Sequence, residues 1–299
     1  MNANVTASLI RREPLRVRLR KLVKSWRPRD MMTMLAEFLL LVIIFVAIFG
    51  PYIAPYDPLH VALRERLEPP SLKHLLGTDE AGRDLLSRMM AGTRITMTSV
   101  LLVLTIVTII GVIVGAVAGY IGGIVDEVLM RFGDLVIAFP PLVLAMALAA
   151  AMGAGLTSAI IAVAFVRWPR YARLVRGQVL ALKNKAFVEA ARCIGVPPWR
   201  ILFRHILINS LDPIIVRVTV DSGYVILTTA SLGFIGLGAQ PPEPEWGVMV
   251  AAGRVFMLNS PWVTVFPGLG IVLAVMGFTL VGDELRDRLD PTLRTMGGQ

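Results

Sequence analysis

A run of charged side chains at residues 77–88 is the part of this sequence that comes closest to catalytic chemistry. Asp79 and Asp84 lie near each other, and paired carboxylates can work as a general acid and a general base. No nucleophile, metal ligand or partner histidine accompanies them in the run, so the pattern does not favour an active site. We expect instead that Thr78 or Asp79 caps a short helix and that Arg83 and Asp84 form ion pairs.

Two charges inside an apolar stretch form a second candidate. Arg217 and Asp221 are four residues apart and would share one face of a helix. Charges buried in a membrane are costly, and they are usually paired or line a water-filled path. Two interpretations therefore remain open: Arg217 and Asp221 neutralise each other within one helix, or they line a pore. An intramembrane hydrolase would need a Ser/His/Asp or metal constellation, which Asp221 alone does not make.

The remaining reactive residue types form no recognisable site. Cys193 is the single cysteine, so no internal disulfide is predicted, and no metal-ligand spacing surrounds it. His60, His74 and His205 are scattered, and we predict no metal site. No Gly-x-x-x-x-Gly-Lys-Ser/Thr phosphate loop occurs, so no ATP and no other cofactor is expected on this chain.

The composition places the chain in a membrane. Of its 299 residues, 56% are hydrophobic and only 17% are charged, whereas soluble domains average about 25% charged residues. We predict an all-α integral membrane protein with six transmembrane helices. The predicted segments are a basic cytoplasmic segment (1–34), a first transmembrane helix (35–54), an outer segment (55–94), a core with five transmembrane helices (95–284) that includes a cytoplasmic loop (177–212), and a cytoplasmic tail (285–299).

Glycine and proline mark the breaks in this core. Gly111, Gly115 and Gly119 repeat every four residues on the second span, a spacing that lets another helix pack closely. Gly122 and Gly123 should end that span and begin a short loop carrying Asp126, Glu127 and Arg131. Pro140 and Pro141 should kink a third span over 135–152, and a turn at 153–155 should precede a fourth that starts at Leu156.

The basic residues predict the orientation. With the N-terminus inside, the inner segments hold 22 Lys and Arg residues and the outer segments hold seven. The positive-inside rule then puts both termini and the loop at 177–212 in the cytosol. The net charge of +9 therefore reflects topology rather than a nucleic-acid partner.

Residues 185–212 form a polar segment in this apolar chain. A helix over 186–194 should stop at Gly195, which can take a left-handed turn, and Pro197 and Pro198 prevent its continuation. A second helix follows, with one apolar stripe made by Trp199, Leu202, Phe203 and Ile206. A simple basic cytosolic loop remains an alternative. DNA binding is disfavoured because neighbouring spans would hold the stripe against the bilayer.

These residues resemble the EAA motif in the permease subunits of bacterial ATP-binding cassette (ABC) importers. The resemblance rests on Glu189-Ala190-Ala191, on Gly195 six positions after the glutamate, and on Ile206-Leu207. Ile208 departs from it, since the family usually has proline there. The resemblance implies a coupling helix that docks on an ATP-binding subunit, with contacts from Glu189, Ala190, Ala191, Arg192, Gly195 and Trp199.

Other motifs resemble the C-type permease of the dipeptide, oligopeptide and nickel importers. They are the segment 77–88, Gly119-Tyr120-Ile121-Gly122-Gly123, the stretch 230–247 with Ala230-Ser231-Leu232-Gly233 and Trp246-Gly247, and Leu285-Arg286-Asp287-Arg288-Leu289-Asp290-Pro291. Together they cover almost all of the chain after the basic N-terminal segment. Within the resemblance, Asp79, Arg83 and Asp84 belong to an outer-face motif.

The resemblance implies a MetI-like fold in the bacterial inner membrane and a non-enzymatic role in ATP-driven import. The implied partners are a second homologous permease, two ATP-binding subunits that hold ATP and Mg, and an external substrate-binding protein. Substrates would be dipeptides, longer peptides, nickel chelates or similar solutes. The alternative is a secondary transporter or channel that works without ATP, although no convincing pair of matching broken half-segments occurs in the sequence.

Overall fold

The computed structural model describes residues 31–289, and every regular element in this part of the chain is a helix. The helices are α3 (Met31–Ile53), α4 (Leu85–Ile121), α5 (Gly123–Ala138), α6 (Pro141–Met152), α7 (Leu156–Leu182), α8 (Ala186–Cys193), α9 (Pro198–Arg200), α10 (Leu211–Ile235), α11 (Trp246–Gly253) and α12 (Trp262–Leu289). Short helical turns are η1 (Leu63–Glu65), η2 (Ile201–Ile206), η3 (Leu207–Ser210) and η4 (Arg254–Phe256). The all-α prediction is confirmed over these residues. The expected basic segment before residue 31 and most of the tail lie outside them.

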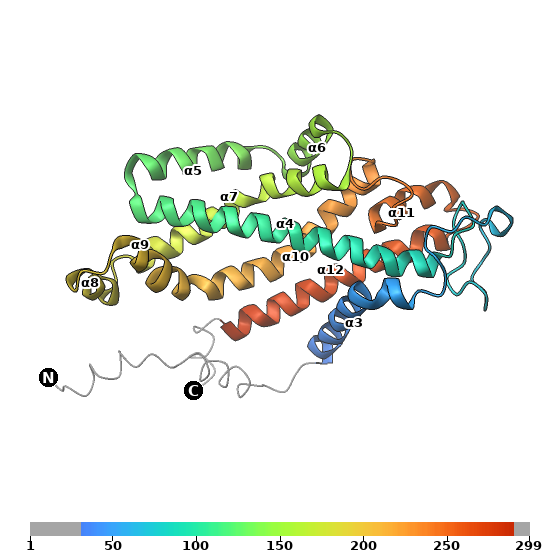
Figure 1. The fold of residues 1–299 in the computed structure, drawn as a ribbon, viewed down its shortest axis with the longest axis horizontal. Helices are drawn as coiled ribbons and strands as arrows, with labels where there is room; N and C mark the ends of the chain where they lie inside the picture. The colour runs from blue at the N-terminus through green and yellow to red at the C-terminus, as the bar shows by residue number, and fades with distance from the viewer. Residues whose placement is uncertain (1–30, 290–299) are drawn as a thin grey trace.

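The long helices run lengthwise beside one another and separate two ends of the molecule (Figure 1). Helices α8 and α9 lie at one end, and α11 with the segment before α4 lies at the other. The apolar core is built mainly where α4, α7 and α10 meet, with Val103, Val163 and Ile226 fully buried in it. The predicted cytoplasmic loop and the predicted outer segment are therefore far apart.

Length and composition support fewer spans than the six predicted. Four stretches among the described residues are long and apolar enough to cross a membrane: α3, α4, the continuous stretch Pro198–Ile235, and α12. Helices α5 and α6 qualify as a pair, but they are bent by 94° at their junction, so the number rises to five if they form one broken span. Helix α7 has 27 residues, but four arginines interrupt its apolar run.

The predicted loop after Gly123 is wrong, because Gly123–Ala138 forms helix α5. Only the two glycines adopt positive φ, +75° at Gly122 and +58° at Gly123, and the residues after them continue as a helix. The charges that follow are compatible with a helix, because Glu127 and Arg131 lie four residues apart and Asp126 pairs with Arg176 of α7. Helix α5 ends before Pro140, because a residue preceding proline is restricted to extended conformations, and Phe139 has a ψ of 145°.

The glycine repeat of α4 faces α7. A Cβ placed on Gly111 would lie 2.3 Å from Cβ of Tyr171, and one on Gly115 would lie 2.3 Å from the carbonyl oxygen of Ala172. A Cβ on Gly119 would lie 2.9 Å from Cβ of Val179. All three glycines are buried. The repeat therefore allows two helices of the same chain to approach closely over about two turns.

The other helices begin and end where the glycines and prolines of the sequence predict, with two exceptions. Helix α7 begins at Leu156 as predicted and continues through Arg170, Arg173 and Arg176 to Leu182. Helix α4 begins at Leu85, within the predicted outer segment. The stretch between α10 and α12 is rich in Pro and Gly, which predicts a loop, but it contains the apolar helix α11.

Candidate functional site

The turn after α8 depends on its glycine. Gly195 has φ of +76°, the left-handed conformation. The N–H of Val196 donates to the carbonyl of Ala191, and the N–H of Gly195 donates to the carbonyl of Arg192, both at 3.0 Å. These two bonds form a Schellman motif. A Cβ on Gly195 would meet no atom within 4 Å, so backbone conformation rather than space requires the glycine. The predicted stop at Gly195 is confirmed.

The apolar stripe predicted for the next helix is wrong in two positions. Leu202 and Ile206 are buried as expected, but Trp199 and Phe203 are 61% and 58% exposed. Residues Ile201–Ile206 form a π-helix rather than an α-helix. A π-helix has more residues per turn than the 3.6 on which the stripe was drawn, so Ile201 takes a buried place instead.

The buried side of the loop is one apolar cluster shared with three long helices. It consists of Val188, Ala191, Ile201, Leu202, Ile206 and Leu207 of the loop, Ala116 of α4, Val175 and Val179 of α7, and Ile214 of α10. Val188 and Ile206 are fully buried in it. Because the loop is packed on α7 and α10 and is covalently continuous with both, a displacement of the loop must move these helices with it.

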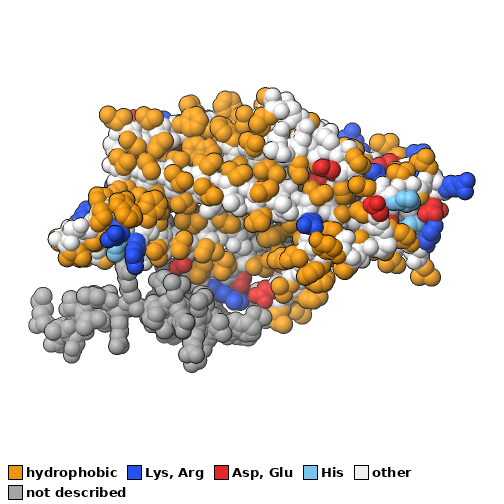
Figure 2. Space-filling view, in the orientation of Figure 1, with side chains coloured by type: hydrophobic (Ala, Val, Ile, Leu, Met, Phe, Trp, Pro, Cys, Tyr) orange, Lys and Arg blue, Asp and Glu red, His pale blue; other side chains and the backbone are white. Residues whose placement is uncertain are grey.

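The exposed side of the loop combines apolar and charged side chains. Glu189, Ala190, Arg192 and Trp199 are exposed, whereas Ala191 is only 5% exposed and belongs to the apolar cluster. Ile194 adds an 80% exposed apolar side chain. Figure 2 shows hydrophobic and basic side chains together at this end of the molecule. Such a mixed surface suits a protein partner.

Asp221 is held mainly by a residue of another helix. Its Oδ1 accepts from Nη2 of Arg167 in α7 at 2.5 Å and lies 3.3 Å from Nη2 of Arg217 in its own helix. Arg167 and Asp221 are 3% and 4% exposed. The guanidinium of Arg167 lies over the ring of Tyr224, 4.0 Å from its centre. The structure thus adds Arg167 to the predicted pair, and the three side chains carry one net positive charge.

Arg217 also reaches an open groove. The groove has a volume of about 510 Å³ and lies between α7, α10 and α12. Leu174, Val216 and Val220 form apolar walls, and Arg286 contributes a second arginine. Arg217 keeps 34% of its side chain exposed, against 6% for Asp221. Of the two residues predicted for a path, only Arg217 therefore lines a cavity.

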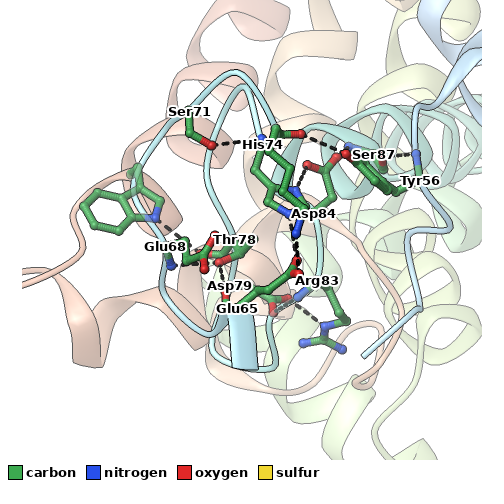
Figure 3. Close-up of polar contacts among 12 residues, drawn as sticks. Tyr56, Glu65, Glu68, Ser71, His74, Thr78, Asp79, Arg83, Asp84 and Ser87 are labelled. Atoms are coloured by element: carbon green, nitrogen blue, oxygen red, sulfur yellow. Dashed lines mark hydrogen bonds and ion pairs between the residues drawn. The ribbon is translucent and has the colours of Figure 1, made fainter. Parts of the chain in front are cut away.

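At the opposite end, Asp79 organises the turn before α4 (Figure 3). Its Oδ1 accepts from the backbone N–H groups of Ala81 and Arg83 at 2.8 and 2.9 Å. Its Oδ2 pairs with Nε of Arg83 at 2.6 Å and with Nε of Arg88 at 3.1 Å. The ion pair predicted for Arg83 is present, but no helix starts at Thr78 or Asp79, because Asp79 closes a turn instead.

Asp84 is the residue that caps a helix. Its Oδ2 accepts from the backbone N–H of Ser87 at 2.8 Å, at the start of α4. Its Oδ1 lies 2.9 Å from Nδ1 of His74, and Nε2 of His74 lies 2.9 Å from Oε2 of Glu65. Burial lowers the pKa of His74, but the bonds to Asp84 and Glu65 outweigh it, so the pKa is raised above its ordinary value. A histidine with a carboxylate at each ring nitrogen is bound as the imidazolium.

Two important residues were missed by the sequence reasoning. His74 is the partner histidine that the charged run at 77–88 was expected to lack, and it lies ten residues before Asp84. Arg167 is the main partner of Asp221, and it lies on a different helix. An arginine near the middle of an otherwise apolar run was the available signal, because a buried charge in a membrane needs a partner. Among residues 31–289, no group of three or more His, Cys, Asp or Glu side chains is arranged so that it could hold a metal ion.

Comparison with known proteins gives two family matches. Residues 111–295 match the family described as "Binding-protein-dependent transport system inner membrane component". Residues 29–70 match the "N-terminal TM domain of oligopeptide transport permease C". The two matches fall on separate parts of the chain, the first covering the helices from the end of α4 onward and the second covering α3 and the segment after it.

Similar proteins match along nearly their whole length. The probable D,D-dipeptide transport system permease protein DdpC of Escherichia coli strain K12 is 45% identical over 260 residues, which is 87% of each chain. The glutathione transport system permease protein GsiD of Pectobacterium atrosepticum is 42% identical over 273 residues, 90% of this chain and 91% of that protein. GsiD of Escherichia coli O6:K15:H31 is 45% identical over 272 residues, 90% of each chain.

Proposed function

Because this chain belongs to the family of inner membrane components of binding-protein-dependent transport systems, we propose a specific route by which it couples ATP hydrolysis to the import of small peptides. The chain is a multi-pass inner membrane protein and the permease subunit of an ABC importer. Such a permease works in a membrane complex with an ATPase and a binding protein. The topology, the coupling surface and the substrate class are the parts that we propose.

The proposed topology has six spans, with α5 and α6 as one broken span and α7 as the next. Arg176 of α7 pairs with Asp126 of α5 at 2.5 Å, and Arg173 pairs with Asp134. Arg167 pairs with Asp221. Paired charges are far less costly in a membrane than isolated ones, which supports α7 as a crossing helix despite its arginines. The excess of inner Lys and Arg residues supports cytosolic termini.

The proposed coupling surface is the exposed side of the loop at 186–208. Glu189, Arg192 and Trp199 would contact a partner ATP-binding subunit, which would hold the ATP and Mg. The observation that carries this proposal is the shared apolar cluster, because it joins the loop to α7 and α10 as one packed unit. Closure of the ATPases would then tilt both helices and change access to the path.

The proposed assembly contains a second homologous permease, two ATP-binding subunits and an external substrate-binding protein. The path would lie between the two permeases, with Arg217 and Asp221 beside it. The named relatives are permease proteins of a probable D,D-dipeptide transport system and of glutathione transport systems. We therefore assign this chain to the import of small peptides, which carry a free carboxylate.

Uptake into vesicles tests this function. The complete complex, reconstituted with its binding protein, should take up a labelled dipeptide only when ATP is present on the ATPase side. A non-hydrolysed ATP analogue serves as the control and should give no accumulation. Uptake driven by an ion gradient without ATP would instead indicate a secondary transporter, and equilibration without either would indicate a channel.

A further inference from the structure

A small pocket lies where the broken span meets α7 and α10. It is lined by Pro141 and Ala145 of α6, Val163 and Arg167 of α7, and Tyr224 and Thr228 of α10. Arg167 is the only charged side chain among these lining residues. The pocket shares no lining residue with the groove at Arg217.

Arg167 enters this pocket with unused donors. Its Nη2 is taken up by Asp221, but Nε and Nη1 are buried and have no hydrogen-bond partner among residues 31–289. The side chain is 97% buried, since only 3% is exposed. A buried donor without an acceptor is costly, and a charged one more so. Oδ2 of Asp221 is also buried without a partner, but it does not reach these donors. The two donors of Arg167 therefore still lack an acceptor, and an anionic one would satisfy them best.

The start of α6 adds a second feature that favours an anion. This helix has 12 residues, and no side chain caps its first turn. Its first free backbone donors are the N–H groups of Leu142 and Val143, because Leu144 already donates to the carbonyl of Pro140. Helix N-termini attract anions through such free N–H groups and through the helix dipole. Pro141 and Ala145 of the same turn line the pocket that Arg167 enters.

We propose that this pocket binds the carboxylate of the transported solute on its way through the membrane. This inference rests on the proposed function and names the group of the substrate that the permease itself recognises. A single carboxylate fits the charge, because Arg167 and Arg217 share only one Asp221 and leave one positive charge uncompensated. In this conformation the pocket has no room for even a water-sized group, so the proposal requires that α6 move about the break at Phe139 and Pro140 before the carboxylate binds.

The test compares a peptide with the same peptide lacking its charge. D-alanyl-D-alanine and its C-terminal amide are offered to the complete importer in vesicles, and the ratio of their ATP-dependent uptake rates is measured. The binding protein is the same throughout, so a change in the ratio between permease variants reports on the permease. Arg167→Gln should lower the preference for the free acid about tenfold, as expected for the loss of one charge-assisted hydrogen bond. Arg173→Gln, six residues further along α7, should leave the ratio unchanged.

A double variant separates recognition from structure. Arg167→Gln combined with Asp221→Asn removes both members of the buried ion pair, and the remaining Arg217 keeps 34% of its side chain exposed to solvent. If Arg167 only holds Asp221, the double variant regains the wild-type ratio, and that result would overturn the inference. If Arg167 binds the solute, the lowered ratio persists in the double variant. An unchanged ratio in Arg167→Gln alone would also overturn it.

The outcomes distinguish the site from the function. If the wild-type importer takes up neither compound with ATP, the proposed substrate class is wrong. The proposal of a carboxylate site is then wrong too, because it depends on that class. If the wild type takes up the dipeptide and the variants do so with an unaltered ratio, the proposed function stands and only the carboxylate site is wrong.

Discussion

The two ends of the molecule are held together by different forces. The loop of α8 to η3 is fixed by an apolar cluster in which Val188 and Ile206 are fully buried. The segment before α4 is fixed by buried polar groups, with Asp79, His74 and Asp84 each only 3% exposed. Apolar packing is insensitive to pH and holds a rigid shape, whereas a buried charge network depends on protonation and on every member being present. The end that carries α8 and α9 is thus suited to transmit force, and the end before α4 to hold a segment in one position.

The largest expected effect comes from breaking the packing that joins the two ends. Gly115→Leu would drive a side chain into the backbone of Ala172, where even a Cβ would lie at 2.3 Å. We expect a destabilisation of about 3 kcal/mol and a strong loss of folded protein after extraction, measured by size-exclusion chromatography. Gly177→Leu on α7 is the control, since a Cβ there meets nothing within 4 Å. Equal yields of the two variants would contradict the α4 to α7 contact.

The next effect should be confined to the outer end. Asp84→Ala removes the cap of α4 and leaves His74 without one of its two carboxylates. We expect a loss of about 2 kcal/mol and faster hydrogen exchange in residues 55–84, with no change in residues 186–208. Glu243→Ala, which removes an exposed carboxylate near the same end, should leave both regions unaltered. Faster exchange in residues 186–208 as well would show that the ends are not independent.

Changes at the end that carries α8 and α9 should affect coupling more than stability. Gly195→Asp places a Cβ in a left-handed turn at a cost of about 1 kcal/mol, and Glu189→Lys reverses a charge on the exposed surface. Both proteins should insert in the membrane and yet bind the ATPase more weakly or hydrolyse ATP without transport. ATPase rate and uptake are measured in the same vesicles.

Gly195→Asn is the matched control for the added charge, because asparagine and aspartate tolerate this backbone conformation to a similar degree. It should retain most of the transport activity. Normal coupling in both Glu189→Lys and Gly195→Asp would mean that the loop is held in the cytosol only by its positive charge, without contacting an ATPase.

The smallest effect is a pH dependence found at one end only. The pKa of His74 is raised above its reference value of 6.5, so its contribution to stability is complete below about pH 6.5 and is lost as the pH rises through the higher folded-state pKa. Hydrogen exchange in residues 55–84 should therefore become faster from neutral to alkaline pH, after correction for the intrinsic exchange rate. His74→Gln should abolish this dependence. A flat profile in the wild type would show that the imidazolium does not hold the segment.

Features set by neighbouring residues could be predicted from the sequence. The stop of α8 at Gly195 and the start of α7 at Leu156 depend on glycine and proline, whose backbone preferences act locally. The all-helical class and the apolar spans follow from composition, because a membrane leaves the backbone few alternatives. The glycine repeat of α4 marked a packing face, although it could not name α7 as the helix that packs there.

Tertiary structure decided which distant side chains meet. Arg167 and Asp221 lie on different helices, and His74 reaches Asp84 and Glu65 only because the segment before α4 folds back on itself. The exposure of Trp199 depends on the π-helix beside it. Local preference and periodicity carry no information on such pairings, because a buried charge is stabilised by whichever partner the packing of the helices brings within reach.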